Sequence, residues 1–271
     1  MRIKTMAPSL SLLLASWVAG GLLLAFILLP LLQMVMKQTP ERLLQTAQVG
    51  EVRTAIVLSL EAAFITTALA ALLGMPLAYL LAHTSFPGKS AAEAIVDLPL
   101  AVPHTVVGIA LLFVFGRTGW VGAPVNALTG YQFWGRLGGI VIAMLFVSVT
   151  YTVNAARVGF ESVDPRLEKV ARTLGAGPWG TLLRVTLPLA RGGILTGLTL
   201  TFARSVSEFG AVIILAYYPM TAPVKIYDLF LQFGLEQSSA MAVLFLVVVL
   251  AFFVLFRHLA RNWRTVPDGR L

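Results

Sequence analysis

Six long apolar runs restrict what this chain can fold into more than any other feature of its sequence. They span about 9–36, 54–82, 95–115, 138–158, 189–217 and 240–256. A helix needs about 20 apolar residues to cross the hydrocarbon core of a bilayer, and open sheets do not occur there because their backbone groups would lack partners. Since only 12% of the residues are charged, against about 25% in soluble domains, we predict an all-α, polytopic membrane protein with six transmembrane helices.

The distribution of positive residues predicts how the chain crosses the membrane. The first run begins like a signal peptide, but it is much longer than the ~7–15 apolar residues of a cleaved signal, so we interpret it as a retained helix. With the N-terminus in the cytoplasm, 13 of the 20 Lys and Arg residues lie in inner segments and six in outer segments. The positive-inside rule therefore predicts a multi-pass protein of the cell (plasma or inner) membrane with both termini cytoplasmic. The net charge of +8 needs no nucleic acid to explain it.

The sequence lacks the residues that several kinds of site require. The chain has no cysteine, which excludes disulfides and cysteine-ligated metals. Its three histidines, His83, His104 and His258, lie in different segments without a partner at ligand spacing, so no metal site is predicted. The stretch from 83 to 90 ends like a phosphate-binding loop but has His where the first Gly belongs. Because nucleophile-elbow and H-E-x-x-H motifs are also absent, we predict no catalytic residue and no cofactor in this chain.

One short segment between the fourth and fifth runs is basic, amphipathic and broken by glycine. It reads LEKVARTLGAGPWGTLLRVTLP from Leu167 to Pro188. Asp164 and Pro165 suit the N-cap and first position of a helix, Gly175 suits a left-handed cap, and Pro178 begins a second helical piece. Apolar residues at helical spacing form a narrow stripe, namely Leu167, Val170, Ala171 and Leu174. A helix of about ten residues cannot span a membrane, so it either lies among lipid headgroups or inserts into a groove of a partner.

This segment resembles the cytoplasmic coupling motif of ATP-binding-cassette (ABC) importer permeases, written E-A-A-x-x-x-G-x9-I-x-L-P. The matching positions are Lys169, Val170, Ala171, Gly175, Val185, Leu187 and Pro188. Lys169 stands where the motif has Glu and Val170 replaces its first Ala, so the neighbouring Glu168 is the obvious acidic substitute. The resemblance implies that the following residues couple the chain to an ATPase: Asp164, Arg166, Leu167, Glu168, Lys169, Ala171, Arg172, Leu174, Gly175, Ala176 and Pro188.

Three further stretches, 72–90, 97–116 and 203–223, are similar to the permease subunits of oxyanion importers, most closely to the molybdate/tungstate branch. The resemblance implies an importer permease of the type I fold that forms the translocation pathway and is coupled to ATP hydrolysis. Its implied partners are a second copy of the permease, two cytoplasmic ATPase subunits that hold ATP and Mg, an extracytoplasmic oxyanion-binding protein and membrane lipid. Sulfate and thiosulfate permeases share the same framework, so a sulfate/thiosulfate importer stays as the alternative.

The resemblance also divides the chain into two parts. We expect residues 1–53 to form an N-terminal transmembrane helix, which wraps a neighbour, and an outer loop. Residues 54–271 are expected to form the permease core, with the cytoplasmic coupling loop at about 159–186. A rival from another class is an ATP-independent ion-coupled transporter, suggested by the membrane-embedded Glu61. The chain holds no nucleotide-binding motif, so inertness without a separate ATPase would distinguish the two.

Prolines and polar residues inside the apolar runs are the candidates for the anion pathway. Pro99 and Pro103 each remove a backbone hydrogen bond, so the third helix should bend or break there. Irregular backbone inside a membrane needs protein or a water-filled cavity to satisfy its polar groups, so this stretch is a candidate wall of the pathway. The alternative is a kink that only improves packing. Arg204 and Glu208 are four apart and can pair, as a structural or gating pair. The candidates are Pro99, Pro103, His104, Thr150, Asn154, Arg204, Ser205, Ser207 and Glu208.

Overall fold

The computed structural model describes residues 9–262, with residues 256–262 as backbone only. No strand is present in this part of the chain. The helices are α1 (Leu10–Met36), α2 (Pro40–Gln48), α3 (Gly50–His83), α4 (Lys89–Ala101), α5 (His104–Phe115), α6 (Gly122–Thr129), α7 (Leu137–Glu161), α8 (Pro165–Thr173), α9 (Pro178–Thr181), the π-helical turn η1 (Leu182–Thr186), α10 (Leu187–Val206), α11 (Gly210–Leu215), α12 (Ala222–Phe233) and α13 (Leu235–Asn262).

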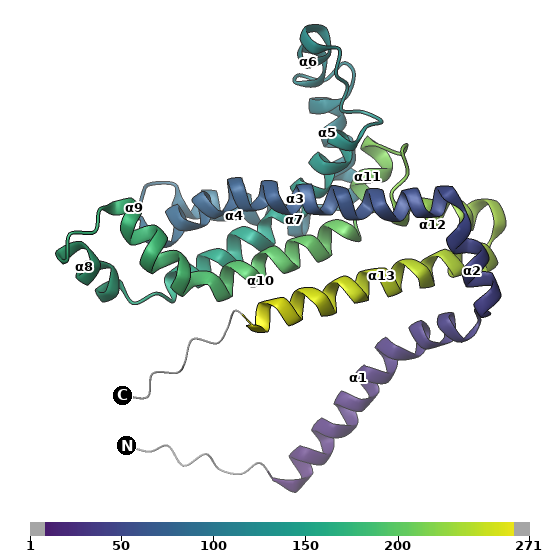
Figure 1. Cartoon of the computed structure of the whole chain (residues 1–271), viewed down its shortest axis with the longest axis horizontal. Coiled ribbons are helices and arrows are strands. Elements are labelled where there is room, and N and C mark those ends of the chain that lie inside the picture. The colour runs from purple at the N-terminus through teal and green to yellow at the C-terminus, as the bar shows by residue number, and fades with distance from the viewer. Residues whose placement is uncertain (1–8, 263–271) are drawn as a thin grey trace.

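The long helices α3, α7, α10 and α13 run side by side along the length of the molecule, as Figure 1 shows. At one end of this bundle lie α8 and α9, and at the other end lie α2 and α12. Five helices within the described residues are long and apolar enough to cross a membrane, and six spans result if the bent pair α4 and α5 counts as one. The all-helical prediction is therefore confirmed for the described residues, and the five or six candidate spans agree with the six predicted.

The third apolar run is broken where the doubled proline predicted a bend. Helix α4 ends at Ala101, α5 begins at His104, and the two are bent by 115°. Val102 is extended, as the residue before a proline usually is, and Pro103 lies directly before α5, where its missing N–H costs nothing. Pro99 remains inside α4 and is buried. The break therefore falls at Pro103.

The fifth run, expected as one helix over 189–217, also consists of two pieces, so that expectation was wrong. Helix α10 ends at Val206 and the short α11 begins at Gly210. Between them, Glu208 turns its carboxylate onto the start of α11, where its Oε1 accepts a hydrogen bond of 2.8 Å from the Ala211 backbone N–H. A carboxylate in this place satisfies a donor that the first turn of a helix leaves free.

A π-helical turn precedes α10, and its cause is Pro188. Pro188 has no N–H and its ring crowds the carbonyl four residues earlier, so the regular hydrogen-bond pattern fails there. The backbone widens instead, and the Leu187 N–H bonds to the Leu182 carbonyl, five residues back. This turn joins the short helices at the end of the bundle directly to α10.

Small residues bring α7 and α10 close together in the centre of the bundle. A side chain on Gly193 would place its Cβ only 2.5 Å from the Gly159 Cα, so both positions need glycine for this approach. Hydrogen bonds between hydroxyls follow the same seam, from Thr152 to Thr201 at 2.7 Å and from Ser205 to Ser148 at 2.9 Å. The seam therefore positions α10 rigidly on α7.

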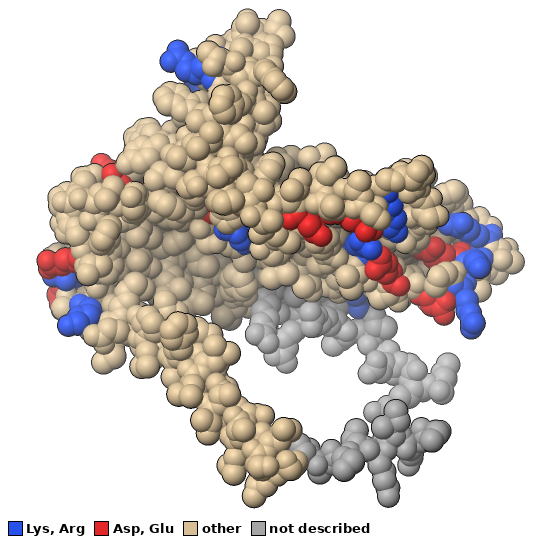
Figure 2. All heavy atoms as spheres, turned by 180° about the vertical axis from the view of Figure 1, so that it is seen from behind, with Lys and Arg blue, Asp and Glu red and all other residues tan. Residues whose placement is uncertain are grey.

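Two parts of the chain project from the bundle with apolar surfaces uncovered. No residue of α1 is buried, and Trp17 is among its exposed side chains. Helices α5 and α6 form an arm that stands across the direction of the bundle (Figure 1), with Phe113, Trp120 and Leu128 exposed. In Figure 2, which shows the reverse face, charged side chains are densest toward the end with α8 and α9, while α1 and most of the arm are free of them.

Ion pairs hold together the end of the bundle opposite α8. Lys225 on α12 lies 2.7 Å from Glu51 on α3 and 3.4 Å from Asp228, whose carboxylate also accepts from the Tyr217 hydroxyl at 3.0 Å. Burial raises the pKa of Asp228, but hydrogen bonds from Gln232, Tyr217 and Lys225 outweigh this and hold the pKa below its ordinary value. The carboxylate therefore stays charged, and α12 stays fixed to α3.

Candidate functional site

The segment from 164 to 188, here called the coupling segment, folds as its local signals predict. Asp164 precedes α8, and its Oδ1 accepts a hydrogen bond of 2.9 Å from the Arg166 backbone N–H. Pro165 occupies the first helical position. The second helical piece, α9, begins at Pro178 as expected. These are local effects of capping residues on the free backbone donors of a helix start.

Gly175 ends α8 in the left-handed conformation, with φ of +92°. Around it the Ala176 N–H bonds to the Ala171 carbonyl and the Gly175 N–H bonds to the Arg172 carbonyl, both at 3.0 Å. This is the Schellman pattern of a glycine-capped helix end. The predicted left-handed cap is confirmed, and it sets the direction in which the chain leaves α8 toward Pro178.

The apolar stripe of the coupling segment faces away from the rest of the molecule. Leu167 and Val170 are exposed, Leu174 is 83% exposed, and Ala171 is half-buried. On α9 and η1 the apolar side chains of Trp179 (75% exposed) and Leu183 are uncovered as well. An apolar surface of this kind at a bundle end suits either a lipid surface or a partner.

Glu168 is the exception among the charged residues of α8, because it is only 8% exposed. Its Oε1 accepts a hydrogen bond of 2.5 Å from the Thr186 hydroxyl and lies 3.3 Å from His83 Nε2. The other predicted coupling residues are exposed or half-buried, with Arg166, Lys169 and Arg172 all exposed. Glu168 therefore points toward the membrane helices rather than outward with the basic residues.

Three charged or polar residues meet where the two broken helices face each other, and we call them the membrane cluster: His104, Arg204 and Glu208. The Arg204 Nη2 lies 2.6 Å from Glu208 Oε2 and 2.6 Å from His104 Nδ1, which confirms the expected pairing of Arg204 with Glu208. Glu208 is fully buried, whereas the Arg204 side chain is 22% exposed. The cluster thus presents a cation partly to the outside and keeps its acid inside.

The remaining pathway candidates are not gathered at this cluster. Ser205 is buried in the seam between α7 and α10, and Thr150 is buried and donates to the Val96 carbonyl at 2.7 Å. Asn154 donates to the Asp97 carboxylate at 2.7 Å. Ser207 is exposed beside the cluster and bonds to its own helix. Thr150, Asn154 and Ser205 thus take part in helix–helix contacts.

Residues that sequence reasoning missed complete several of these contacts. Asp97 is the partner of Asn154, and Arg157 lies 2.9 Å from Glu93 on α4 and 2.7 Å from Glu161 on its own helix. The spacing of Glu93 and Asp97 on one face of a helix was a usable signal. His83 and Thr186 carried no such signal, since they reach Glu168 from distant places in the sequence.

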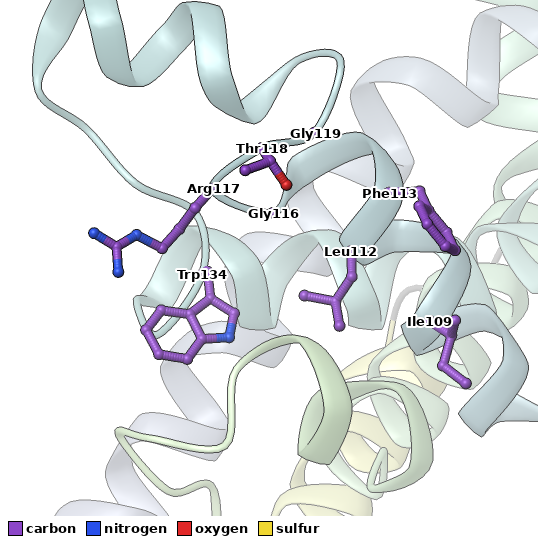
Figure 3. Close-up of a pocket in the computed structure, with 8 residues that line it drawn as sticks. All are labelled: Ile109, Leu112, Phe113, Gly116, Arg117, Thr118, Gly119 and Trp134. Atoms are coloured by element: carbon purple, nitrogen blue, oxygen red, sulfur yellow. The ribbon is translucent and has the colours of Figure 1, made fainter.

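An open surface pocket of about 420 Å³ lies on the arm, near the end of α5 (Figure 3). Ile109, Leu112 and Phe113 line it from α5, with Arg117 and Trp134 on its other side. It shares no residue with the membrane cluster, and its lining is mainly apolar. Among the residues whose side chains are described, no group of three or more His, Asp or Glu could hold a metal ion.

Comparison with solved structures identifies the fold. A chain of a bacterial ABC transporter that imports the acidic polysaccharide alginate has the same fold, with a TM-score of 0.66 over 92% of this chain and 96% of that chain, at 20% identity. The described residues therefore share the all-helical fold of a chain from an ABC importer, with five or six helices that could cross a membrane.

Comparison of sequences identifies the family. The chain belongs to the family of binding-protein-dependent transport system inner membrane components, whose model matches residues 70–265. It is 44% identical to the molybdate/tungstate transport system permease protein of Thermococcus kodakarensis over 242 residues, which are 89% of this chain and 92% of that protein. It is 31% identical to a probable sulfate transport system permease protein of Nephroselmis olivacea over 248 residues, 89% of this chain and 85% of that protein.

Proposed function

We propose that this chain is the permease subunit of an ABC importer for molybdate or tungstate. The observation that carries the proposal is the coupling segment, a capped amphipathic helix whose apolar face is uncovered at one end of a membrane-spanning bundle. The identity with the Thermococcus molybdate/tungstate permease supports the choice of anion. Sulfate or thiosulfate is the second candidate, because a probable sulfate permease is also similar over most of the chain.

ATP hydrolysis, translocation and delivery of the anion are carried out by different subunits of the proposed importer. A cytoplasmic ATPase binds and hydrolyses ATP with Mg, two copies of the permease form the pathway, and an extracytoplasmic protein delivers the anion. The uncovered apolar surfaces of α1 and of the arm supply area for contact with the second copy and with lipid. The exposed basic residues of α8 supply charge for contact with the ATPase.

The anion pathway is proposed to pass the membrane cluster. Irregular backbone in a membrane needs protein or water to satisfy it, and the breaks at Pro103 and Ser207 meet there. Arg204 offers an anion one partly exposed cation, while the buried Glu208 limits how strongly that cation holds it. The site should therefore bind weakly and release the anion, and tight binding by the permease alone would contradict this.

Anion-stimulated ATP hydrolysis tests the proposed function. The permease, its ATPase and the binding protein are reconstituted together, and ATP hydrolysis is measured with molybdate, tungstate, sulfate or no anion. Molybdate and tungstate should raise the rate several-fold above the anion-free rate, since the loaded binding protein favours the state that hydrolyses ATP. Stimulation by sulfate alone would establish the sulfate alternative, and transport without any ATPase would establish an ion-coupled transporter.

The orientation in the membrane can be tested separately. Topology reporters fused after Arg42 in α2 and after Arg172 in α8 should lie on opposite sides of the membrane, with Arg172 in the cytoplasm. The two sites are at opposite ends of the bundle in Figure 1. Reporters on the same side would contradict the proposed six-span topology with both termini inside.

A further inference from the structure

The carboxylate of Glu168 links α8 to the start of α10 and to the end of α3. It accepts the Thr186 hydroxyl, at the junction of η1 and α10, and it lies 3.3 Å from the ring of His83, the last residue of α3. Thr186 is fully buried and Glu168 is 8% exposed. Water therefore has little access to this contact, so the partners cannot readily be exchanged for solvent.

His83 is itself held in place by aromatic neighbours. Its ring stacks on Tyr79 at a centroid distance of 4.2 Å and approaches the edge of Phe160, on α7, at 6.2 Å. Its Nδ1 lies 3.2 Å from the Tyr79 carbonyl, which leaves Nε2 facing Glu168. A ring restrained on its face and on one nitrogen has a fixed orientation, so a displacement of Glu168 acts on α3 and not merely on a free side chain.

We infer that Glu168 is a positioning residue that transmits movement of α8 to α3 and α10, and that it does not contact the ATPase. The inference rests on the proposed function in that α8 is the ATPase-binding helix. The charged residues of α8 divide accordingly, with Arg166, Lys169 and Arg172 exposed and Glu168 turned inward. The motif position that usually carries the acid holds Lys169 here. The acid one residue earlier, Glu168, faces the membrane helices and not the ATPase.

The apolar contacts of α8 are too few to transmit movement by themselves. Its apolar residues are exposed or half-buried, and Glu168 is the only buried residue on the helix. Without the Glu168 contact, α8 could tilt with the ATPase while α3 and α10 stayed where they are. Loss of the contact should therefore spare assembly and ATP hydrolysis and reduce the anion transported per ATP.

The test compares two substitutions at each end of the hydrogen bond in the reconstituted complex. Thr186→Val removes the hydroxyl at nearly constant shape, whereas Thr186→Ser keeps it; Glu168→Ala removes the acceptor, whereas Glu168→Gln keeps an oxygen for Thr186. Thr196→Val is the matched control, because Thr196 is exposed on α10 and its hydroxyl bonds only within that helix. Three quantities are measured: ATPase bound per permease, the ATP hydrolysis rate, and anion transported per ATP.

For Thr186→Val and Glu168→Ala we expect unchanged ATPase binding and at least a tenfold lower ratio of transport to hydrolysis, about the effect of one charge-assisted hydrogen bond. Thr186→Ser and Thr196→Val should stay within about twofold of the wild type. The inference is wrong if Glu168→Ala instead releases the ATPase, or if Thr186→Val couples as well as Thr186→Ser.

A measurement on the permease alone separates this inference from the proposed function. Hydrogen exchange of the α8 amides should be faster in Thr186→Val than in the wild type and unchanged in Thr186→Ser, because the contact restrains α8 without any ATPase. Equal exchange in all three would overturn the inference. A wild-type complex that no oxyanion stimulates would contradict the proposed function, while the exchange result would still decide whether Glu168 restrains α8.

Discussion

Valine in place of Gly175 is expected to give a folded, membrane-inserted permease that binds its ATPase poorly or fails to couple hydrolysis to transport. The backbone at Gly175 has φ of +92°, a conformation that costs a residue with a side chain roughly 1–2 kcal/mol. Apart from Gly175 itself and its two chain neighbours, no atom lies within 4 Å of the place where its Cβ would stand. The effect would therefore come from the backbone alone, through loss of the helix cap and a new direction of the chain into α9.

Gly177 provides a matched control for this experiment. It lies two residues further on in the same turn, its φ is −68°, and a Cβ there would also meet nothing within 4 Å. Gly177→Val should therefore behave like the wild type within about twofold, because extended backbone before a proline suits a β-branched residue. Equal losses in the two variants would show that any bulk in this turn is harmful, and that the left-handed cap is not the cause.

Co-purification and crosslinking measure the outcome. The amount of ATPase that purifies with each variant reports binding, and a cysteine at Arg172 reports proximity, since the chain has no other cysteine. If α8 instead lies among the lipid headgroups, Gly175→Val would leave ATPase binding almost unchanged and Arg172 would never crosslink to the ATPase. That combination would overturn the coupling role of the segment.

Local signals predicted the structure of the coupling segment closely. The Asp164 cap, the left-handed Gly175 and the start of α9 at Pro178 all depend on residues within a few positions of one another. The break at Pro103 is also local, because a proline acts on the carbonyl and backbone next to it. Such features can be read from sequence since their causes lie within one turn of helix.

Features that depend on distant residues could not be predicted in the same way. The motif indicated that Glu168 would face the ATPase. Its carboxylate instead faces His83, which lies 85 positions away in the sequence, so no local pattern could predict this contact. The break in the fifth run could not be predicted from hydropathy, because α11 is as apolar as a membrane helix and so continues the apolar run. Arg204 and Glu208 were predicted to pair from their spacing of four, whereas His104 joins them from 100 positions away.

Substitutions of the two charged members of the membrane cluster should have unequal effects on stability. Arg204→Gln leaves a fully buried carboxylate without its cation, and breaking a buried pair in this way costs about 3–5 kcal/mol. Glu208→Gln keeps an oxygen for the Ala211 N–H and leaves a cation that is 22% exposed, so its cost should be at most about half as large. Thermal unfolding of the purified permease should show a drop of about 10 °C for Arg204→Gln and a clearly smaller drop for Glu208→Gln.

The double variant Arg204→Gln with Glu208→Gln distinguishes a structural pair from a gate. Replacing both charges by neutral groups of similar size removes the unpaired acid, so the double variant should be more stable than Arg204→Gln alone. If the membrane cluster closes the pathway, the same variant should leak anion in reconstituted vesicles without ATP, because the contact between α5 and α10 through His104 and Arg204 is weakened. A double variant that is stable, tight without ATP and fully active with it would show that the cluster stabilises the fold without gating the anion.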